Sequence, residues 1–320
     1  MSDVAVIGAG AWGTALALQA ARAGATVTLW ARDPERATAM RAGRVNPRLP
    51  GVTLPASISI TAHLPRAALT LLVVPLQHMR AVAAGVPGAG PLVVCAKGVE
   101  AGSLKLPLEV LAEMSPLRSA AVLTGPNFAR EVALGLPAAS VVAATDAGLR
   151  AAVIAALGTA NFRLYGNDDP IGAQLGGAAK NVVAIAAGVV VGAGLGENAR
   201  AALVTRGLAE ISRLAVALGG RAETVAGLSG LGDVLLTCTG NASRNFTLGM
   251  ELGRGRALAA VLAERSAVTE GVLTAPALAA RADRHGVSLP IIATMAAVMR
   301  GDLDVTAAVG ALLGRPTRDE

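Results

Sequence analysis

The sequence predicts an α/β protein with an N-terminal Rossmann-type parallel sheet domain followed by an all-helical C-terminal domain. Three observations lead to this prediction. Short β-branched segments alternate with helical segments from the N-terminus onward, as in a parallel sheet covered by helices. A glycine-rich turn separates the first strand from the first helix. No strand-like segment follows Tyr165, so we expect a dinucleotide-binding domain over residues 1–166 and a helical substrate domain over residues 167–320.

The expected strands are short, and each ends at a turn or loop signal. The run from residue 69 to residue 74 is almost continuously apolar, as parallel strands buried on both faces require. The first helix, residues 11–23, ends at Gly24. The expected strands cover residues 4–7, 26–30, 70–74, 92–95, 120–123, 140–144 and 162–165.

The expected helical domain opens at Asp169 and Pro170, an N-cap residue followed by proline at the first helical position. Helices are expected over residues 171–191, 200–218, 249–264, 274–285 and 291–299. The second of these has an apolar face at helical spacing, formed by Val204, Leu208, Ile211, Ala215 and Leu218. The opposite face is expected to carry Arg206, Glu210 and Arg213.

The composition excludes several classes of protein. Hydrophobic residues make up 53% of the chain and charged residues 16%, against roughly 25% charged residues in an average protein. A membrane-spanning helix needs about 20 consecutive apolar residues, whereas the longest uncharged runs, residues 4–21 and 181–196, are shorter and contain glycine. The first run also lacks the basic segment of a signal peptide. We therefore expect a cytoplasmic protein without an integral membrane segment.

The charged and metal-binding side chains are dispersed. The net charge is +6, from 28 basic and 22 acidic residues, and no basic run or aromatic cluster indicates a nucleic-acid surface. An anionic small ligand is compatible with this charge. Cys95, Cys238 and the three histidines have no zinc-binding spacing, so we expect no metal and two reduced cysteines.

Gly8, Gly10 and Gly13 form the motif GAGAWG between the first strand and the first helix. The first glycine permits a tight turn, the second lets the backbone approach a pyrophosphate, and the third lets helix and strand pack closely. The pyrophosphate would lie at the helix N-terminus, where free N–H groups and the helix dipole favour an anion. The motif therefore predicts a dinucleotide site.

The end of the second strand bears on the identity of the dinucleotide. An acidic residue there binds the ribose 2′-hydroxyl of NAD, whereas a nearby arginine suits the 2′-phosphate of NADP. Here the acid is absent and Arg32 follows the strand. This favours NADPH. NADH remains the alternative, because Arg32 could be a solvated loop residue and the adjacent Asp33 could turn inward.

Lys180 is the only ionisable residue between residues 170 and 196. Its helical neighbours three and four positions away are Gly176, Gly177, Val183 and Ala184, which would leave room for another group to approach. No acidic residue nearby in the sequence neutralises it. Two interpretations stay open: a lysine that works in a site, or a lysine that extends along an apolar helix to reach water.

Four polar segments fall where a ligand is expected. Lys97 and residues 125–129 each follow a strand, and open α/β sheets bind ligands at the carboxyl ends of their strands. Residues 230–233 and 243–245 are polar groups among apolar helices, and Arg244 has the donors to bind a phosphate. Each segment alone would fit a turn or a helix cap. Together they predict one site shared between the two domains.

Several segments occur in the order found in one family. They are GAGAWG, VCAKG, TGPNFA, QLGGAAKNVVAIAAG, RGLAEISRLAVALG, GLGDVLLTCT, SRNFTLG and TEGVLT, and they span residues 4 to about 275. In these segments the chain resembles the bacterial NAD(P)-dependent glycerol-3-phosphate dehydrogenases. The lysine helix, GLGD and SRN together are highly specific, whereas the glycine motif alone is not.

The resemblance implies roles for individual residues. Lys180 matches the family's catalytic base, and Asp233 would orient it. The substrate positions are Lys97, Gly125, Asn127, Lys180, Asp233, Ser243, Arg244 and Asn245. The cofactor positions are Gly8, Gly10, Ala11, Trp12, Gly13, Arg32, Lys97, Ala129, Arg244, Val268 and Glu270. Two residues depart from the family: Ala11 replaces a common serine and can offer only its backbone, and Asn127 replaces a common Thr or Ser but keeps a hydrogen-bonding side chain.

The reaction implied by the resemblance is the interconversion of dihydroxyacetone phosphate and sn-glycerol 3-phosphate, a phospholipid precursor. Protonated Lys180 would stabilise charge on the ketone oxygen and donate the proton, while Arg244 and Asn245 would hold the substrate phosphate. A homodimer is compatible with the resemblance. Two alternatives stay open: another two-domain dehydrogenase acting on a different phosphorylated or carboxylated ketone, and a catalytically silent NADPH-binding sensor, which would have lost the lysine or the SRN group.

Overall fold

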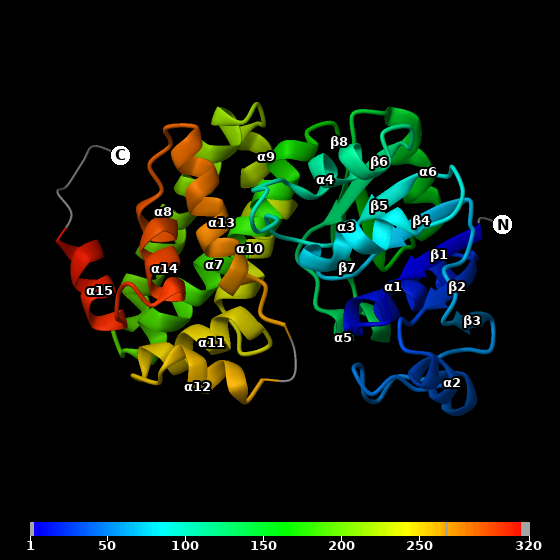
Figure 1. The fold of residues 1–320 in the computed structure, drawn as a ribbon, viewed down its shortest axis with the longest axis horizontal. Helices are drawn as coiled ribbons and strands as arrows, with labels where there is room; N and C mark the ends of the chain where they lie inside the picture. The colour runs from blue at the N-terminus through cyan, green and yellow to red at the C-terminus, as the bar shows by residue number, and fades with distance from the viewer. Residues whose placement is uncertain (1–2, 266–267, 315–320) are drawn as a thin grey trace. The chain divides into compact units, whose positions relative to one another are not determined.

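The computed structural model describes residues 3–265 and 268–314. It divides into two compact units (Figure 1): a first unit of Met1–Lys97 and Leu106–Ala173, and a second unit of Gly98–Lys105 and Gln174–Glu320. The first unit holds a sheet covered by helices and the second is helical, which confirms the predicted fold class. Residues 98–105, which the sequence placed in the first domain, belong to the second unit, where Arg281 Nη1 donates to the carbonyl of Leu104 (2.7 Å).

The first unit contains an eight-stranded sheet with the strand order β3-β2-β1-β4-β5-β6-β7-β8. Neighbouring strands are parallel except β6 and β7, which are antiparallel, so the sheet is mixed rather than wholly parallel as expected. The edge strand β3 is not among the expected strands, because it has four residues, of which only Ile58 and Ile60 are buried. The strands are β1 (Asp3–Ile7), β2 (Thr26–Trp30), β3 (Ile58–Thr61), β4 (Leu69–Leu72), β5 (Leu92–Val94), β6 (Ala120–Thr124), β7 (Ala138–Ala143) and β8 (Phe162–Asn167).

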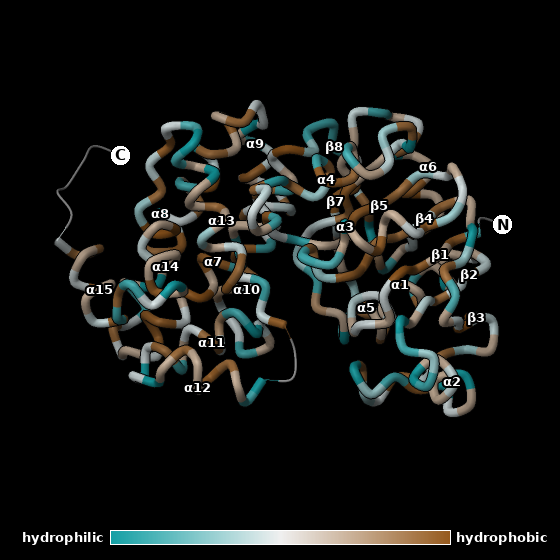
Figure 2. The backbone as a smooth tube through the Cα atoms, in the orientation of Figure 1, coloured by the Kyte–Doolittle hydropathy of each residue, from teal (hydrophilic) through white to brown (hydrophobic). Residues whose placement is uncertain are grey.

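Both faces of this sheet are buried. Val4 and Val6 of β1 pack into one core, while Ala5 and Ile7 pack into another. The first core includes residues of α1 (Ala11–Arg22), α2 (Pro34–Gly43), α5 (Ala129–Leu134) and α6 (Ala147–Leu157). The second core includes residues of α3 (Leu76–Ala84) and α4 (Pro107–Met114). The apolar colour along β1, β4 and β5 in Figure 2 is that of strands covered on both faces.

Helix α7 (Pro170–Gly192) begins in the first unit and belongs to the second unit from Gln174 onward. Asp169 Oδ1 accepts a hydrogen bond from the backbone of Gly172 (2.8 Å), which is the predicted N-cap contact. The helix is long and apolar enough to cross a membrane, but 89% of its most apolar window is buried inside the fold, as in a core helix. The other elements of the unit are α8 (Gly196–Ala217), α9 (Ala222–Ala226), the π-helical turn η1 (Leu228–Gly232), α10 (Asp233–Cys238), α11 (Arg244–Gly253), α12 (Leu258–Ala263), α13 (Gly271–Arg284), α14 (Pro290–Arg300) and α15 (Val305–Leu313).

Helices α7 and α11 approach each other along glycine residues. A Cβ atom at Gly188 of α7 would lie 2.1 Å from the carbonyl oxygen of Phe246. On the facing helix, a Cβ atom at Gly249 would lie 1.9 Å from the carbonyl oxygen of Ile185. No side chain fits at such distances, so the two helices pack backbone to backbone.

The helical half differs from the prediction in two respects. The helix expected over residues 249–264 is two helices, α11 and α12, because Gly255 between them adopts a left-handed conformation with φ +85°. The segments α9, η1, α10 and α15 are helical although they are not among the expected helices. The first three have only five or six residues each, so their apolar residues do not repeat often enough to show a helical period.

Glu210 contradicts the expected pattern of α8. Its spacing placed it opposite the apolar face, but it is 2% exposed. Its two carboxylate oxygens accept hydrogen bonds from the backbone of Ile291 (2.7 Å) and Ile292 (3.1 Å) at the start of α14. The first N–H groups of a helix have no partner within it, and an anion is favourable there. Glu210 is therefore buried because it caps a helix that lies far away in the sequence.

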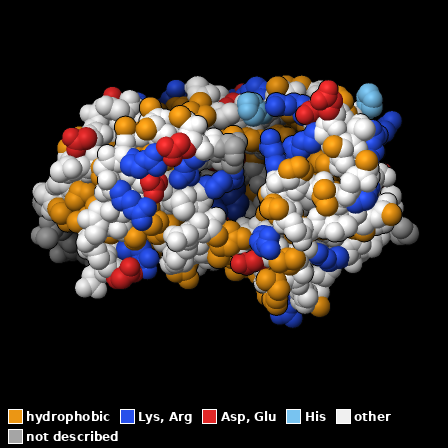
Figure 3. All heavy atoms as spheres, turned by 90° about the horizontal axis from the view of Figure 1, so that it is seen from below, with side chains coloured by type: hydrophobic (Ala, Val, Ile, Leu, Met, Phe, Trp, Pro, Cys, Tyr) orange, Lys and Arg blue, Asp and Glu red, His pale blue; other side chains and the backbone are white. Residues whose placement is uncertain are grey.

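The charged side chains of residues 251–264 form ion pairs. On the face of the second unit seen in Figure 3, acidic side chains lie next to basic ones. The ion pairs of this region join Arg254 to Glu251 (2.7 Å), and Arg256 to both Glu251 (3.0 Å) and Glu264 (2.5 Å). These ion pairs neutralise part of the positive charge that the arginines give the chain.

Candidate active site

The loop between β1 and α1 requires glycine at two positions. Gly8 has φ +122°, a conformation that other residues rarely adopt, and a Cβ atom there would lie 2.6 Å from the carbonyl oxygen of Val73. A Cβ atom at Gly13 would lie 1.8 Å from the carbonyl oxygen of Gly8. The motif therefore provides a tight turn and close packing of helix on strand.

The N-terminus of α1 is open to a ligand. Its N-cap residue, Gly10, has no side chain to bond the first N–H groups, and a Cβ atom there would meet no atom of the described residues within 4 Å. The next two residues, Ala11 and Trp12, are partly buried. Free N–H donors and the positive end of the helix dipole fit the pyrophosphate of a dinucleotide.

Arg32 and Asp33 follow β2, and both are exposed. The Asp33 carboxylate caps α2, because its Oδ1 accepts hydrogen bonds from the backbone of Glu35 (3.0 Å) and Arg36 (3.4 Å). This contact holds Asp33 on its own helix and argues against the alternative in which it turns toward a ribose hydroxyl. The residue at this strand end that suits a 2′-phosphate is Arg32.

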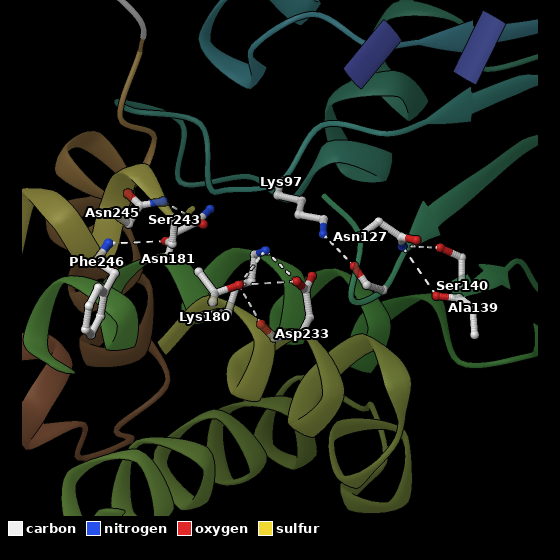
Figure 4. Close-up of polar contacts among 12 residues, drawn as sticks. Lys97, Asn127, Ala139, Ser140, Lys180, Asn181, Asp233, Ser243, Asn245 and Phe246 are labelled. Atoms are coloured by element: carbon white, nitrogen blue, oxygen red, sulfur yellow. Dashed lines mark hydrogen bonds and ion pairs between the residues drawn. The ribbon is translucent and has the colours of Figure 1, made fainter. Parts of the chain in front are cut away.

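The predicted substrate residues of the first unit lie together after β5 and β6. Lys97 Nζ donates a hydrogen bond to the carbonyl of Gly125 (3.2 Å). Gly125 has φ +149°, and a Cβ atom there would lie 3.0 Å from the Cα atom of Ser140. Asn127 Nδ2 donates to the Ser140 hydroxyl (2.5 Å) and to the carbonyl of Ala139 (3.4 Å), as Figure 4 shows. The side chain of Asn127 is thereby fixed against β7.

Lys180 lies on α7 and is 9% exposed. Its ammonium nitrogen is 2.5 Å from Asp233 Oδ1 and 3.0 Å from the Thr237 hydroxyl (Figure 4). Asp233 is fully buried, and the Thr237 hydroxyl donates to the carbonyl of Asp233 (2.6 Å). Lys180 therefore does not extend to bulk water, and the interpretation as a solvent-seeking lysine is wrong.

The turn η1 approaches α7 closely enough to bring Asp233 to Lys180. A Cβ atom at Gly176 would lie 2.5 Å from the carbonyl oxygen of Ser229. The group that the small neighbours of Lys180 were expected to admit is thus, on the side of Gly176, the backbone of η1. The close approach also buries the ammonium and the carboxylate together, which avoids the larger cost of burying either alone.

Cys238 lies on α10, near this pair. Burial raises the pKa of its thiol to about 12, while Lys180 lowers it and Asp233 adds to the rise. Burial also raises the pKa of the Cys95 thiol well above its usual range. Both cysteines are free and remain protonated at neutral pH, so neither is an activated nucleophile.

The SRN segment lies at the start of α11. The Ser243 hydroxyl caps the helix by accepting a hydrogen bond from the backbone three residues later (3.2 Å). Asn245 is buried: its Nδ2 donates to Asn181 Oδ1 (2.9 Å), and its Oδ1 accepts from the backbone of Gly271 (3.1 Å). Arg244 is exposed. Ser243 and Asn245 therefore hold the segment, and Arg244 is the residue of the three that an anion can reach.

The remaining predicted cofactor residues lie at the starts of helices. Ala129 is the first residue of α5 in the first unit. In the second unit, Glu270 precedes α13, and Val268, two residues earlier, is 50% exposed. Their assignment to the cofactor stays a prediction.

Both halves of the chain match models of one family. Residues 3–150 match the N-terminus of NAD-dependent glycerol-3-phosphate dehydrogenase, and residues 169–310 match its C-terminus. The chain belongs to the NAD-dependent glycerol-3-phosphate dehydrogenase family. The glycerol-3-phosphate dehydrogenase (NAD(P)+) of Gluconobacter oxydans is 53% identical over 322 residues, and that of Acidiphilium cryptum is 54% identical over 319 residues. Each alignment covers 99% of this chain and 98% of the relative.

Solved structures of the glycerol-3-phosphate dehydrogenase family agree in three dimensions. The crystal structure of the Coxiella burnetii glycerol-3-phosphate dehydrogenase has a TM-score of 0.93 at 37% identity, and the match covers 98% of this chain and 99% of that one. The resemblance found in the motifs is therefore confirmed: the chain is an oxidoreductase of this family, with NAD(P) as its cofactor. A D-mandelate dehydrogenase structure with NADH, at 12% identity and a TM-score of 0.62, shares the fold alone.

Two residues of this family member contact the predicted site but are absent from the prediction. Thr237 lies four residues after Asp233, one helical turn along the GLGDVLLTCT segment, and bonds Lys180. Asn181 follows Lys180 directly and bonds Asn245. Both are polar residues in apolar stretches, and that signal was available in the sequence.

Proposed function

We propose that this chain interconverts dihydroxyacetone phosphate and sn-glycerol 3-phosphate, with NADPH or NADH as the cofactor. The observation that carries the proposal is the buried contact between Lys180 and Asp233, which holds a proton donor away from bulk water in a chain of this family. The product of the reductive direction would supply phospholipid synthesis.

The first unit fits the cofactor at the uncapped N-terminus of α1, where Gly10 leaves open space. When bound, the reduced nicotinamide supplies the hydride that reduces the ketone carbon. We assign nucleotide binding to residues 1–166 and the substrate chemistry to residues 167–320. The cofactor residues of the first unit are Gly8, Gly10, Ala11, Trp12, Gly13, Arg32, Lys97 and Ala129, and those of the second are Arg244, Val268 and Glu270.

Lys180 acts as the catalytic acid and base in this proposal. Its protonated form stabilises the negative charge that develops on the ketone oxygen and donates a proton to that atom. In the opposite direction, the neutral amine accepts the proton of the C2 hydroxyl. Asp233 and Thr237, at 2.5 and 3.0 Å from the Lys180 nitrogen, both lie on α10 and together fix the position of that nitrogen.

Arg244 binds the substrate phosphate in this proposal. Its guanidinium is exposed on the first turn of α11 and offers several donors to a phosphate dianion. The dipole of a ten-residue helix favours an anion at the same end. Asn245 contributes chiefly by its bonds to Asn181 and Gly271, which hold the start of the helix. Lys97, Gly125 and Asn127 are the substrate residues assigned to the first unit.

The chain is further proposed to form a homodimer through a groove on the second unit. The groove has a volume of about 1270 Å³ and is lined by residues of α7, α8, α14 and α15. It exposes three large apolar side chains, Leu195 (42%), Val216 (56%) and Leu313 (78%). Exposed apolar side chains that gather in one groove often mark a protein–protein contact, and a second copy would cover them.

We also propose a cytoplasmic location. Cys95 and Cys238 are both free and buried. Free cysteines are usual in a reducing compartment, whereas disulfides form in extracellular ones.

The experiment that tests the proposed function is NADPH oxidation by the purified protein, followed by the absorbance of NADPH. We expect saturable oxidation with dihydroxyacetone phosphate, and reduction of NADP+ with sn-glycerol 3-phosphate. Unphosphorylated dihydroxyacetone is expected to react very poorly, because each charge-assisted hydrogen bond to the phosphate contributes roughly 1.5–3 kcal/mol. Oxidation of NADPH with pyruvate, or reduction of NADP+ with 3-phosphogluconate, and no reaction with dihydroxyacetone phosphate, would contradict the proposal.

A further inference from the structure

The glycine loop is held from behind by two side chains that do not belong to the motif. The carbonyl oxygen of Ala9, between Gly8 and Gly10, accepts a hydrogen bond from Asn46 Nδ2 (3.1 Å) and another from the guanidinium of Arg36. Ala9 is 4% exposed and Asn46 is 1% exposed, so the contact between them is shielded from solvent, while Arg36 is half-buried. The loop carbonyl is therefore fixed on the side of α2 and of the segment that follows it.

Asn46 has a partner at each of its polar atoms. Besides the Ala9 carbonyl, its Nδ2 contacts the hydroxyl of Thr14 on α1 (2.6 Å). Its Oδ1 accepts hydrogen bonds from Arg36 Nη2 (3.0 Å) and from the backbone of Arg48 (3.1 Å). A buried amide requires such partners. Here they join the loop, the first turns of α1, α2 and the segment after α2 into one network.

Glycine alone does not select this loop conformation. Gly8 and Gly10 make the turn sterically possible, but glycine also has more alternative conformations than any other residue. The direction of the first N–H groups of α1 therefore depends on contacts outside the motif. The contacts of Ala9 and Thr14 with Asn46 are of this kind, because both residues lie within one helical turn of Gly10.

We propose that Arg36 and Asn46 are positioning residues for the dinucleotide: they hold the Ala9 carbonyl so that the N-terminus of α1 presents its N–H groups to the pyrophosphate. The inference rests on the proposed function only in requiring that a dinucleotide binds there. It assigns these two residues an effect on NADPH and NADH alike, because the pyrophosphate is common to both.

Arg36 differs from Arg32 in what its guanidinium contacts. Arg36 Nη2 is directed to the Ala9 carbonyl and to Asn46 Oδ1, within the first unit, whereas Arg32 is exposed at the end of β2. Burial lowers the pKa of the Arg36 guanidinium, nearby Arg48 lowers it further, and Asp33 opposes both effects. Arg32 is accordingly the residue that distinguishes the two cofactors, and Arg36 is one that serves both.

The test is direct binding of NADPH and of NADH to Arg36→Met, Asn46→Ala and Arg36→Lys, measured by cofactor fluorescence, with Michaelis constants and turnover measured in parallel. We expect Arg36→Met and Asn46→Ala each to raise both dissociation constants by about tenfold, the effect of losing one charge-assisted or buried hydrogen bond. The ratio of the two constants should stay within about twofold of that of the unaltered protein. Arg36→Lys keeps a charged donor and should restore most of the affinity. The Michaelis constants for both cofactors should rise by more than turnover falls.

The matched control is Arg41→Met on the same helix. Arg41 is exposed, and its guanidinium donates a hydrogen bond to the Thr38 hydroxyl of its own helix (2.9 Å), so this change removes a positive charge without touching the loop. It should leave both dissociation constants within about twofold. If Asn46→Ala does not fold, the half-buried Arg36 variants decide the question.

Three outcomes would overturn the proposal. The first is unchanged affinity of Arg36→Met for both cofactors, and the second is a loss confined to NADPH, which would assign Arg36 to the 2′-phosphate. The third is an unaltered protein that binds neither nucleotide, which would overturn the proposed function as well. A protein that binds both nucleotides but does not turn over dihydroxyacetone phosphate would overturn the proposed function alone, because the positioning role is measured by binding.

Discussion

Methionine at position 180 would keep most of the apolar stem of the lysine and remove its charge and its transferable proton. General acid–base catalysis contributes about 10²–10⁴-fold, and the lost charge stabilisation adds to that. We therefore expect Lys180→Met to reduce turnover by at least about a hundredfold while cofactor binding persists. Turnover of the purified variant is the measurement.

Cofactor fluorescence is the folding control for that variant, because the nucleotide residues of the first unit are unaltered. Turnover within a fewfold of the unaltered protein, with cofactor binding intact, would remove Lys180 from the mechanism and direct attention to Lys97. A variant that binds no cofactor would instead indicate that burying Asp233 without its partner unfolds the chain, as a lone buried carboxylate can. Asp233→Asn in the same background would then restore binding but not turnover.

The substitution Arg32→Glu would reverse the charge at the end of β2. It should raise the Michaelis constant for NADPH, because a carboxylate repels the 2′-phosphate, and leave that for NADH nearly unchanged. Steady-state kinetics with the two cofactors is the measurement. An equal rise of the Michaelis constants for both cofactors would show that Arg32 has a structural role, like that of the neighbouring Asp33, which caps α2.

The thiol of Cys238 should make stability depend on pH in the alkaline range. Its pKa is raised from 9.0 to about 12 in the folded chain, so between these values the unfolded chain releases a proton that the folded chain retains. The free energy of unfolding should therefore fall as pH rises from about 9 toward 12. Cys238→Ala should lack this part of the decline. Denaturant unfolding at pH 8 and pH 10 gives the decline in the free energy of unfolding for each protein. An equal decline in the two proteins would contradict the assignment.

At the scale of residues, the sequence identified the unusual positions better than their partners. An isolated lysine in an apolar helix singled out Lys180, but its pairing with Asp233, 53 residues away, was expected only from the family resemblance and not from spacing. The asparagines at 181 and 245 bond across 64 residues. Such pairings depend on how two helices approach, which spacing along one helix does not contain. The same limit explains why Glu210 was expected outside and is found beneath α14.

At the scale of elements, the close contact between α7 and α11 should not tolerate a side chain. Gly249→Ala would place a methyl group 1.9 Å from the carbonyl oxygen of Ile185. Helix α11 would have to move away, and Arg244 and Asn245 would move with it. Overpacking of this kind costs about 1–3 kcal/mol, or more where backbone is struck. We expect a lower thermal midpoint and weaker binding of the phosphorylated substrate.

Gly310→Ala is the matched control for that change. Gly310 lies in α15, and a Cβ atom there would meet no atom of the described residues within 4 Å. Alanine is favoured over glycine in a helix by about 1 kcal/mol, so this variant should be as stable as the unaltered chain or slightly more stable. Equal effects of the two substitutions would show that the contact between α7 and α11 is looser than the structure has it.

Elements with a strong local signal were predicted well. The buried strands and α1 follow from apolar runs and the glycine motif, because strands covered on both faces must be apolar throughout. The direction of β7 and the presence of β3 were not foreseen, since a strand carries the same pattern in either direction and an edge strand is half polar. The break between α11 and α12 depends on one glycine whose φ angle the sequence does not reveal.

At the scale of the whole molecule, the groove of the second unit leads to a prediction about assembly. Light scattering should give a mass near twice 31.7 kDa for the unaltered chain. Val216→Glu would place a charge in the groove, because Val216 is 56% exposed there, and should shift the population toward monomer. A monomeric unaltered chain, or a dimer insensitive to this change, would contradict the proposed interface.

Residues 98–105 make the second unit discontinuous, and this affects how the halves of the chain can be exchanged with those of a relative. The main chain passes between the units after Lys97, after Lys105 and again after Ala173. A chimera could join the first 166 residues of this chain to the C-terminal half of a relative. Its residues 98–105 would then come from this chain, whereas the residue in place of Arg281, which binds the Leu104 carbonyl here, would come from the relative. Chimeras in which residues 98–105 travel with the C-terminal half should keep their parents' stability better than chimeras made at a single crossover.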